Sequence, residues 1–146
     1  MIKKAKKYFL LILFVSVVSS LSNCKKQSDA IPATYVDFMV YLTQPQYVSL
    51  NAVGGWVYLT GGVKGIIVFR KSPTEFAAYE RDCPYDPNAA NARIDVDNSG
   101  VIGVDSNCGS KFSLADNSIV NGPTTHSMRA YYADYNSSSQ TIHVHS

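Results

Sequence analysis

The sequence predicts an all-β domain, built as an antiparallel sandwich or barrel. Short apolar segments alternate with polar residues at the period of two that half-buried strands show. Turn-forming sequences such as Asp97-Asn98-Ser99-Gly100 separate these segments. Beyond the first 23 residues, no segment carries an apolar stripe at the 3.6-residue period of a helix. These patterns favour short strands joined by tight turns.

The expected strands follow one another along the chain. The segment 36–43 alternates apolar and polar residues, which is typical of a half-buried strand. The segment 65–70 is a continuous apolar run with the length of a buried strand. Ser72-Pro73-Thr74 predicts the turn of a hairpin that continues into the segment 75–80. The remaining expected strands are 53–60, 93–96, 101–104, 128–135 and 141–145.

The N-terminus has the pattern of a bacterial lipoprotein signal. Four lysines lie among the first seven residues, and the apolar stretch 9–18 is short for a membrane span but long enough for a signal-peptide core. Leu21-Ser22-Asn23-Cys24 then resembles a lipobox, in which Cys24 becomes the lipidated first residue of the mature protein. The alternative is an uncleaved signal anchor in which Cys24 is incidental.

This pattern divides the chain into three parts. We expect residues 1–23 to be a signal peptide, residues 24–34 a lipidated tether, and residues 35–146 the β domain. The expected partner is a membrane, reached through the acyl chains on Cys24. The expected location is the bacterial cell envelope, with the outer membrane favoured, where disulfides can persist.

Charge argues against nucleic acid as a partner. The whole chain has a formal net charge of +2. Four of its lysines belong to the expected signal peptide, so the mature chain keeps nine basic side chains against eleven acidic ones, a formal charge of −2. A basic patch for nucleic acid therefore has no basis in the mature protein.

Two short loops carry the most informative motifs. They are Cys83-Pro84-Tyr85 and the segment from Asp105 to Phe112, which reads Asp-Ser-Asn-Cys-Gly-Ser-Lys-Phe. They resemble the two cluster-binding loops of the Rieske iron–sulfur family, Cys-x-His and Cys-x-x-His-Gly-Ser-x-Phe, with both histidines gone. A Rieske [2Fe–2S] centre has two thiolates on one iron and two imidazoles on the other. Tyr85 stands where the first histidine belongs.

The second loop aligns with the family in two registers. Anchored on its cysteine, it places Lys111 in the histidine slot. Anchored on Gly109-Ser110-Lys111-Phe112, it places Cys108 in the histidine slot and Asp105 in the cysteine slot. We prefer the second register because Gly122-Pro123 also matches the segment that closes over the cluster in the family. His126 lies three residues beyond Pro123 and could face the old site.

The resemblance implies a small antiparallel β framework with an inserted loop subdomain that begins at Cys83. It argues for the architecture and against the cofactor, because neither register leaves a histidine in the loops. We therefore expect no cofactor and no metal, with a [2Fe–2S] cluster on unusual ligands as the alternative. Because the family's loops converge, a Cys83–Cys108 disulfide is possible, and two free, half-buried thiols are the other outcome.

The favoured function is that of a cluster-less Rieske-fold lipoprotein, acting as a binding or structural module. The alternatives are an electron-transfer protein with unusual cluster ligands and a thiol–disulfide redox module. No acid–base partner accompanies Ser110 or Tyr85, so the sequence predicts no catalytic residue. His143 and His145 share one face of the last strand, where a solvated surface is expected because no third metal ligand is evident.

Overall fold

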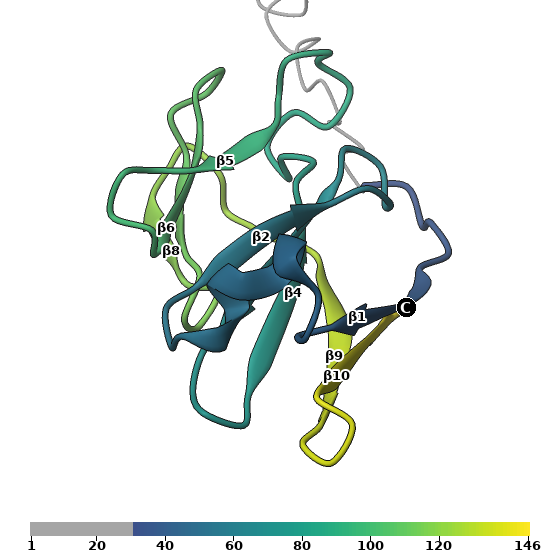
Figure 1. The fold of residues 1–146 in the computed structure, drawn as a ribbon. Helices are drawn as coiled ribbons and strands as arrows, with labels where there is room; N and C mark the ends of the chain where they lie inside the picture. Colours follow the sequence, from purple (N-terminus) through teal and green to yellow (C-terminus); the bar gives the residue numbers. More distant parts are fainter. Residues whose placement is uncertain (1–30) are drawn as a thin grey trace, which may run out of the picture.

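The protein is all-β, as predicted. The computed structural model describes residues 31–146 and places them in two antiparallel sheets (Figure 1). The larger sheet has six strands in the order β1-β10-β9-β4-β3-β2, and the smaller has four in the order β5-β6-β7-β8. The expected signal peptide, Cys24 and most of the tether fall within residues 1–30 and so lie outside the described residues.

Each of the eight strands expected from periodicity and turn signals overlaps an observed strand. The larger sheet contains β1 (Asp37–Tyr41), β2 (Trp56–Leu59), β3 (Ile66–Arg70), β4 (Phe76–Glu80), β9 (Ala130–Asn136) and β10 (Thr141–His145). The smaller sheet contains β5 (Ile94–Val96), β6 (Ile102–Asp105), β7 (Lys111–Ser113) and β8 (Ile119–Asn121).

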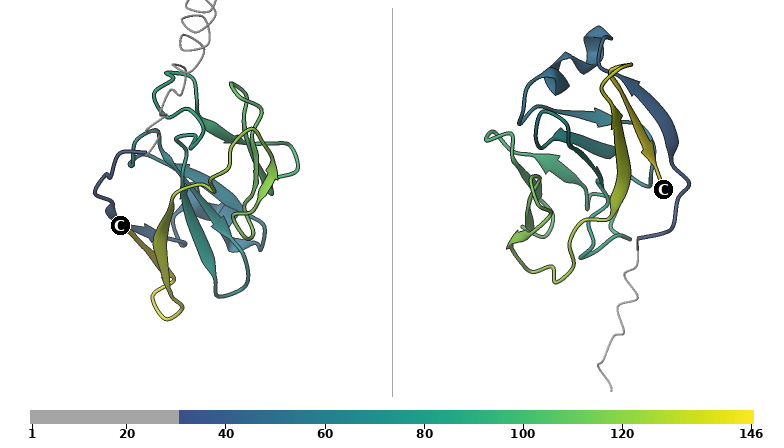
Figure 2. Two further views of the ribbon diagram at one scale, coloured as in Figure 1. Left: turned by 180° about the vertical axis from the view of Figure 1, so that it is seen from behind. Right: turned by 90° about the horizontal axis from the view of Figure 1, so that it is seen from below.

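The smaller sheet is an insertion between two neighbouring strands of the larger one. β4 pairs with β9 through Ala78↔Tyr131 and Tyr79↔Ala130, and the whole smaller sheet lies between them in the sequence. Figure 2 shows this sheet standing beside the curled larger sheet. Both loops identified in the sequence belong to this insertion.

The first four residues of strand β3 are apolar because they lie between two cores. Alternate residues of a strand point to opposite faces. Ile66 and Val68 therefore reach the core inside the curled sheet, whereas Ile67 and Phe69 reach the core under the smaller sheet. The first core also contains Val36, Val40, Leu42, Leu50, Phe76, Ala78, Tyr131, Ile142 and Val144. The second also contains Tyr79, Cys83, Ala92, Ile94, Phe112, Leu114 and Met128.

A 3₁₀ helix, η2 (Pro45–Asn51), was not predicted from the sequence pattern. Proline is favoured at the first helical position, but Leu50 is the one buried residue of this helix, so no apolar repeat reveals it. The strand expected at 53–60 begins only at Trp56 because the chain first turns at Gly54, where φ is +84°. Such a positive φ favours glycine.

The end of β4 joins the larger sheet to the insertion. The Tyr79 hydroxyl donates to the Leu114 carbonyl at 3.1 Å, and burial raises the pKa of Tyr79 to about 12. The Arg81 guanidinium lies 3.7 Å from the centre of the Tyr58 ring, pairs with Asp95 and donates to the Ile94 carbonyl. These contacts fix the direction in which the chain enters the first loop.

Glu80, the last residue of β4, is a fully buried carboxylate that accepts four hydrogen bonds. Its Oε2 accepts from the Val63 amide at 2.8 Å and the Tyr131 hydroxyl at 2.7 Å. Its Oε1 accepts from the amides of Lys64 at 2.9 Å and Asp82 at 3.0 Å. Buried charges are tolerated when hydrogen bonds replace their water. Glu80 therefore holds the β2–β3 turn against the start of the first loop.

Replacing Tyr131 with phenylalanine tests this arrangement. Tyr131→Phe removes one donor from buried Glu80 and should lower the free energy of unfolding by about 1–3 kcal/mol. Tyr132→Phe is the matched control, because Tyr132 is 65% exposed and its loss of a hydroxyl should change stability by about 0.5 kcal/mol or less. Urea denaturation of both variants measures the difference. Equal stability of the two variants would contradict the role given to the Tyr131 hydroxyl.

Candidate functional site

Two loops meet beside the smaller sheet. Loop one, residues 81–93, connects β4 to β5, and loop two, residues 105–110, connects β6 to β7. Loop two is a tight turn in which the Asp105 amide donates to the Ser110 carbonyl at 3.0 Å and the Gly109 amide donates to the Asp105 carbonyl at 2.8 Å. Gly109 has a φ of +80°, a conformation that favours glycine. The side-chain amide of Asn91 donates to Asn107 Oδ1 at 2.9 Å and links the two loops.

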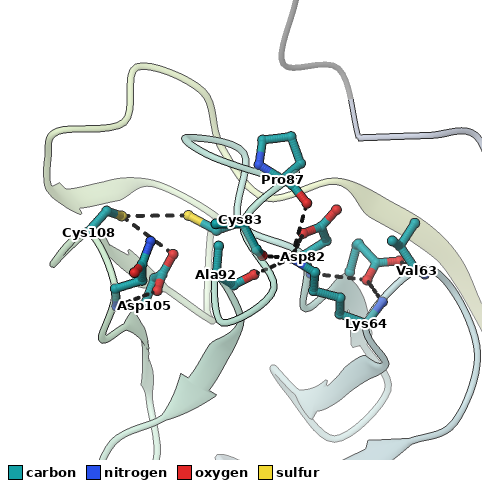
Figure 3. A network of polar contacts seen from close by, with 11 residues as sticks. Val63, Lys64, Asp82, Cys83, Pro87, Ala92, Asp105 and Cys108 are labelled. Atoms are coloured by element: carbon teal, nitrogen blue, oxygen red, sulfur yellow. Dashed lines mark hydrogen bonds and ion pairs between the residues drawn. The ribbon is translucent and has the colours of Figure 1, made fainter.

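The loops bring Cys83, Asp105 and Cys108 together (Figure 3). The two Sγ atoms are 3.7 Å apart, and both residues are free thiols. Cys108 Sγ lies 3.5 Å from Asp105 Oδ2. One ligand atom from each of the three residues lies within 4.8 Å of the others. We call these three residues the thiol–carboxylate group.

The members of the group differ in exposure. Cys83 and Asp105 are fully buried, whereas Cys108 is partly exposed. Burial raises the pKa of the Cys83 thiol, and its contact with the Asp105 carboxylate raises that pKa further. Asp105 Oδ1 accepts a hydrogen bond of 2.8 Å from the Asn107 amide, which leaves Oδ2 turned toward Cys108. Cys108 is therefore the member that solvent can reach.

Other predicted site residues surround this group. Ser110 is fully buried, and its Oγ contacts Cys108 Sγ at 3.1 Å and accepts from the Thr124 amide at 3.2 Å. The closing segment that follows β8, residues 122–126, thus holds loop two through Thr124, while Gly122 and Pro123 are exposed.

Three candidate ligands lie outside the group. The backbone amide of Tyr85 bonds Cys83, and its side chain is 39% exposed. His126 is exposed, and its amide donates to Thr124 Oγ1. Lys111 is an exposed residue of β7. The loop therefore brings Asp105, rather than Lys111, next to the cysteines.

The donors of this group do not fit a Rieske cluster. Such a cluster needs two thiolates and two imidazoles, with two ligands on each iron. Within residues 31–146, the one group of three potential metal ligands has two thiols, one carboxylate and no imidazole.

Lys64 organises loop one, a role that the sequence pattern does not indicate. Its ammonium, in the turn between β2 and β3, donates to the carbonyls of Pro87, Ala89 and Ala92 at 3.1, 2.7 and 2.9 Å. It also lies 2.8 Å from Asp82 Oδ1 (Figure 3). One partly buried cation thus contacts both ends of the loop that carries Cys83.

Asp82 depends on this cation. Its side chain is fully buried, and burial raises the pKa of its carboxyl while Lys64 opposes that rise. A sequence signal did exist, since Glu80-Arg81-Asp82 places three charges where a buried strand ends. The same pattern is also typical of a strand that ends at the surface, so it does not by itself reveal that the side chains of Glu80 and Asp82 are buried.

His143 and His145 lie on the outer face of β10, opposite buried Ile142 and Val144, as the alternation predicted. The centroids of their imidazole rings are 4.6 Å apart. His143 Nε2 bonds Asp37 at 2.7 Å, and His145 Nε2 bonds Asp134 at 2.9 Å. The bond to Asp134 raises the pKa of His145. Both Nε2 atoms are thus engaged by carboxylates.

Comparison with known proteins adds no relative. No protein-family model matches the chain, and no curated protein matches it either. Among residues 31–146, no helix is long and apolar enough to cross a membrane.

Replacing Lys64 with methionine should open loop one. Lys64→Met keeps the length of the side chain but leaves buried Asp82 without its cation and three carbonyls without a donor. The free energy of unfolding should fall by about 3–5 kcal/mol near neutral pH. Lys71→Met, at an exposed position, is the control and should change it by about 0.5 kcal/mol or less.

The pH dependence of this effect has a definite sign. Without Lys64, the pKa of Asp82 in the folded protein should rise further above its unfolded value. The folded variant then holds a proton that the unfolded chain releases, so the variant loses stability as pH rises through this range. Urea denaturation should show a smaller cost of Lys64→Met at acid pH than at neutral pH. A cost that grew on acidification would contradict the ion pair.

Proposed function

We propose that this chain is a cluster-less, Rieske-like lipoprotein domain of the bacterial envelope that acts as a binding or structural module. The observation that carries the proposal is the donor set where the two loops meet. Two thiols and a carboxylate converge there, and no imidazole joins them among the described residues. Electron transfer through a Rieske cluster requires ligands that this group lacks.

The arrangement of the chain also supports this proposal. The insertion between β4 and β9 carries both loops, and Thr124 of the closing segment bonds Ser110 of loop two. Hydrogen bonds and the Lys64 ammonium thus hold the loops in place. A scaffold of this kind can present a preformed group for a ligand.

A thiol–disulfide module is the second candidate, favoured by the 3.7 Å between the two sulfur atoms. Redox-active cysteines are typically accessible and have a lowered pKa, because the thiolate is the nucleophile. Cys83 has the opposite properties, since it is fully buried and its pKa is raised. The thiols therefore suit a binding role better than exchange.

The cofactor experiment measures iron and acid-labile sulfide in the full-length chain, extracted from membranes in detergent and purified anaerobically. We expect neither component in stoichiometric amount, no visible charge-transfer bands, and no Rieske-type EPR signal after reduction with dithionite. A chain with both histidines restored, Tyr85→His with Cys108→His and Asp105→Cys, provides the comparison. Stoichiometric iron and sulfide in the unmodified chain would replace the proposal with electron transfer.

The lipoprotein part of the proposal has its own test. Cys24 should be the site of processing and should incorporate a fatty-acid analogue in a bacterial host. Cys24→Ser should abolish both labelling and processing, whereas Cys108→Ser should leave them intact. Mass spectrometry of the mature N-terminus measures the outcome. An unlabelled, soluble wild-type protein would remove the lipid anchor from the proposal.

A further inference from the structure

Asp105 and Asp82 are both fully buried aspartates, but only one of them has a cation. Asp82 is paired with the Lys64 ammonium at 2.8 Å. No basic side chain of residues 31–146 forms an ion pair with Asp105. Its Oδ2 instead faces Cys108 Sγ. A buried carboxylate without a compensating charge is costly, so the thiol–carboxylate group has a place for a positive ion.

Two of the three separations between the ligand atoms match those around a tetrahedral ion, and the third is no longer than 4.8 Å. With zinc–sulfur bonds of about 2.3 Å, two ligands on a tetrahedron lie about 3.8 Å apart, and a sulfur and an oxygen lie about 3.5–3.6 Å apart. The observed separations are 3.7 Å between the sulfurs and 3.5 Å between Cys108 Sγ and Asp105 Oδ2. Two thiols in simple contact would have a similar spacing, so the buried carboxylate beside them is the deciding feature.

We propose that Cys83, Cys108 and Asp105 bind a single zinc ion. This inference deepens the proposed function, on which it rests, by naming the ligand that the two loops bind. Two thiolates and one carboxylate suit a borderline-soft ion, whereas calcium and magnesium prefer oxygen ligands alone. Three protein ligands leave the fourth position to a water molecule or to a donor from another molecule.

Neighbouring groups are arranged to support these ligands. The Ser110 amide lies 3.5 Å from Cys108 Sγ, and the Tyr85 amide bonds Cys83. Hydrogen bonds to sulfur stabilise the thiolate form that a metal requires. The Asn107 amide fixes the carboxylate of Asp105 through Oδ1. Such contacts around the ligands orient them toward the metal.

Metal titration of the full-length chain tests the inference. The protein is kept in detergent with a phosphine reductant under argon, and free thiols are counted before each titration. We expect one equivalent of zinc to bind and to raise the melting temperature. Cobalt should give the intense charge-transfer absorption of thiolate ligands and tetrahedral ligand-field bands, and zinc should displace it.

Substitutions identify the ligands. Asp105→Asn should weaken zinc binding by at least about 100-fold, because even contacts behind the ligands change metal affinity by about 10–100-fold. Asp97→Asn makes the same change on a partly exposed turn away from the group and should leave zinc binding unaltered. Cys108→Ser removes one of the two thiolates and should strongly weaken the cobalt charge-transfer band, whereas Cys24→Ser should leave it unchanged. The melting shift of the unmodified chain gives an answer even where a variant folds poorly.

Three outcomes would overturn this inference. The first is a chain with both thiols free that binds no zinc, and the second is zinc binding that Asp105→Asn leaves unchanged. The third is a Cys83–Cys108 disulfide without zinc in freshly extracted protein. None of these outcomes touches the proposed function, which fails on a different result, the presence of stoichiometric iron and acid-labile sulfide.

Discussion

The burial of two neighbouring carboxylates, Glu80 and Asp82, is the constraint on which the arrangement of the loops depends. Glu80 accepts four hydrogen bonds, two of them from the amides of Val63 and Lys64 in the β2–β3 turn. The ammonium of Lys64 then compensates Asp82 and gathers three carbonyls of loop one. Because a buried charge without a partner costs several kcal/mol, turn and loop hold each other in place. Cys83 follows Asp82 directly, so the contacts that fix Asp82 also fix the position of Cys83.

The need of a buried carboxylate for a compensating cation also distinguishes the two sides of Cys83 (Figure 3). On one side, the protein supplies its own cation to Asp82 through Lys64. On the other side, Asp105 is just as buried but faces two thiols. Loop two holds that carboxylate rigidly through the Asn107 amide, and Thr124 holds loop two through Ser110. A rigid group of donors with an uncompensated charge is the arrangement expected of a site whose cation comes from outside the chain.

Eight of the ten strands in residues 31–146 were predictable from local patterns, whereas β7 and β8, of three residues each, were not. The alternation in β1 and the continuous apolar run of β3 are direct consequences of one or two buried faces. The sequence analysis also singled out the loops of Cys83 and Cys108, and the structure brings these two residues together with Asp105. The roles of Lys64 and Glu80 were not predictable, because all of their partners except the Asp82 amide lie 16 to 51 residues away in the chain and no local period reports such contacts. Helix η2 was not predicted for a related reason, since its single buried residue, Leu50, gives no apolar repeat.

X-ray absorption at the zinc edge of the metal-loaded full-length chain reports the atoms bound to the ion, and so tests whether the thiol–carboxylate group holds it. We expect two sulfur atoms at about 2.3 Å and oxygen atoms at about 2.0–2.2 Å from the zinc. Asp105→Asn should remove part of the oxygen contribution while the sulfur contribution persists in whatever zinc remains bound. A first shell of nitrogen and oxygen alone, with no sulfur, would place the ion away from Cys83 and Cys108 and would rule out the proposed site.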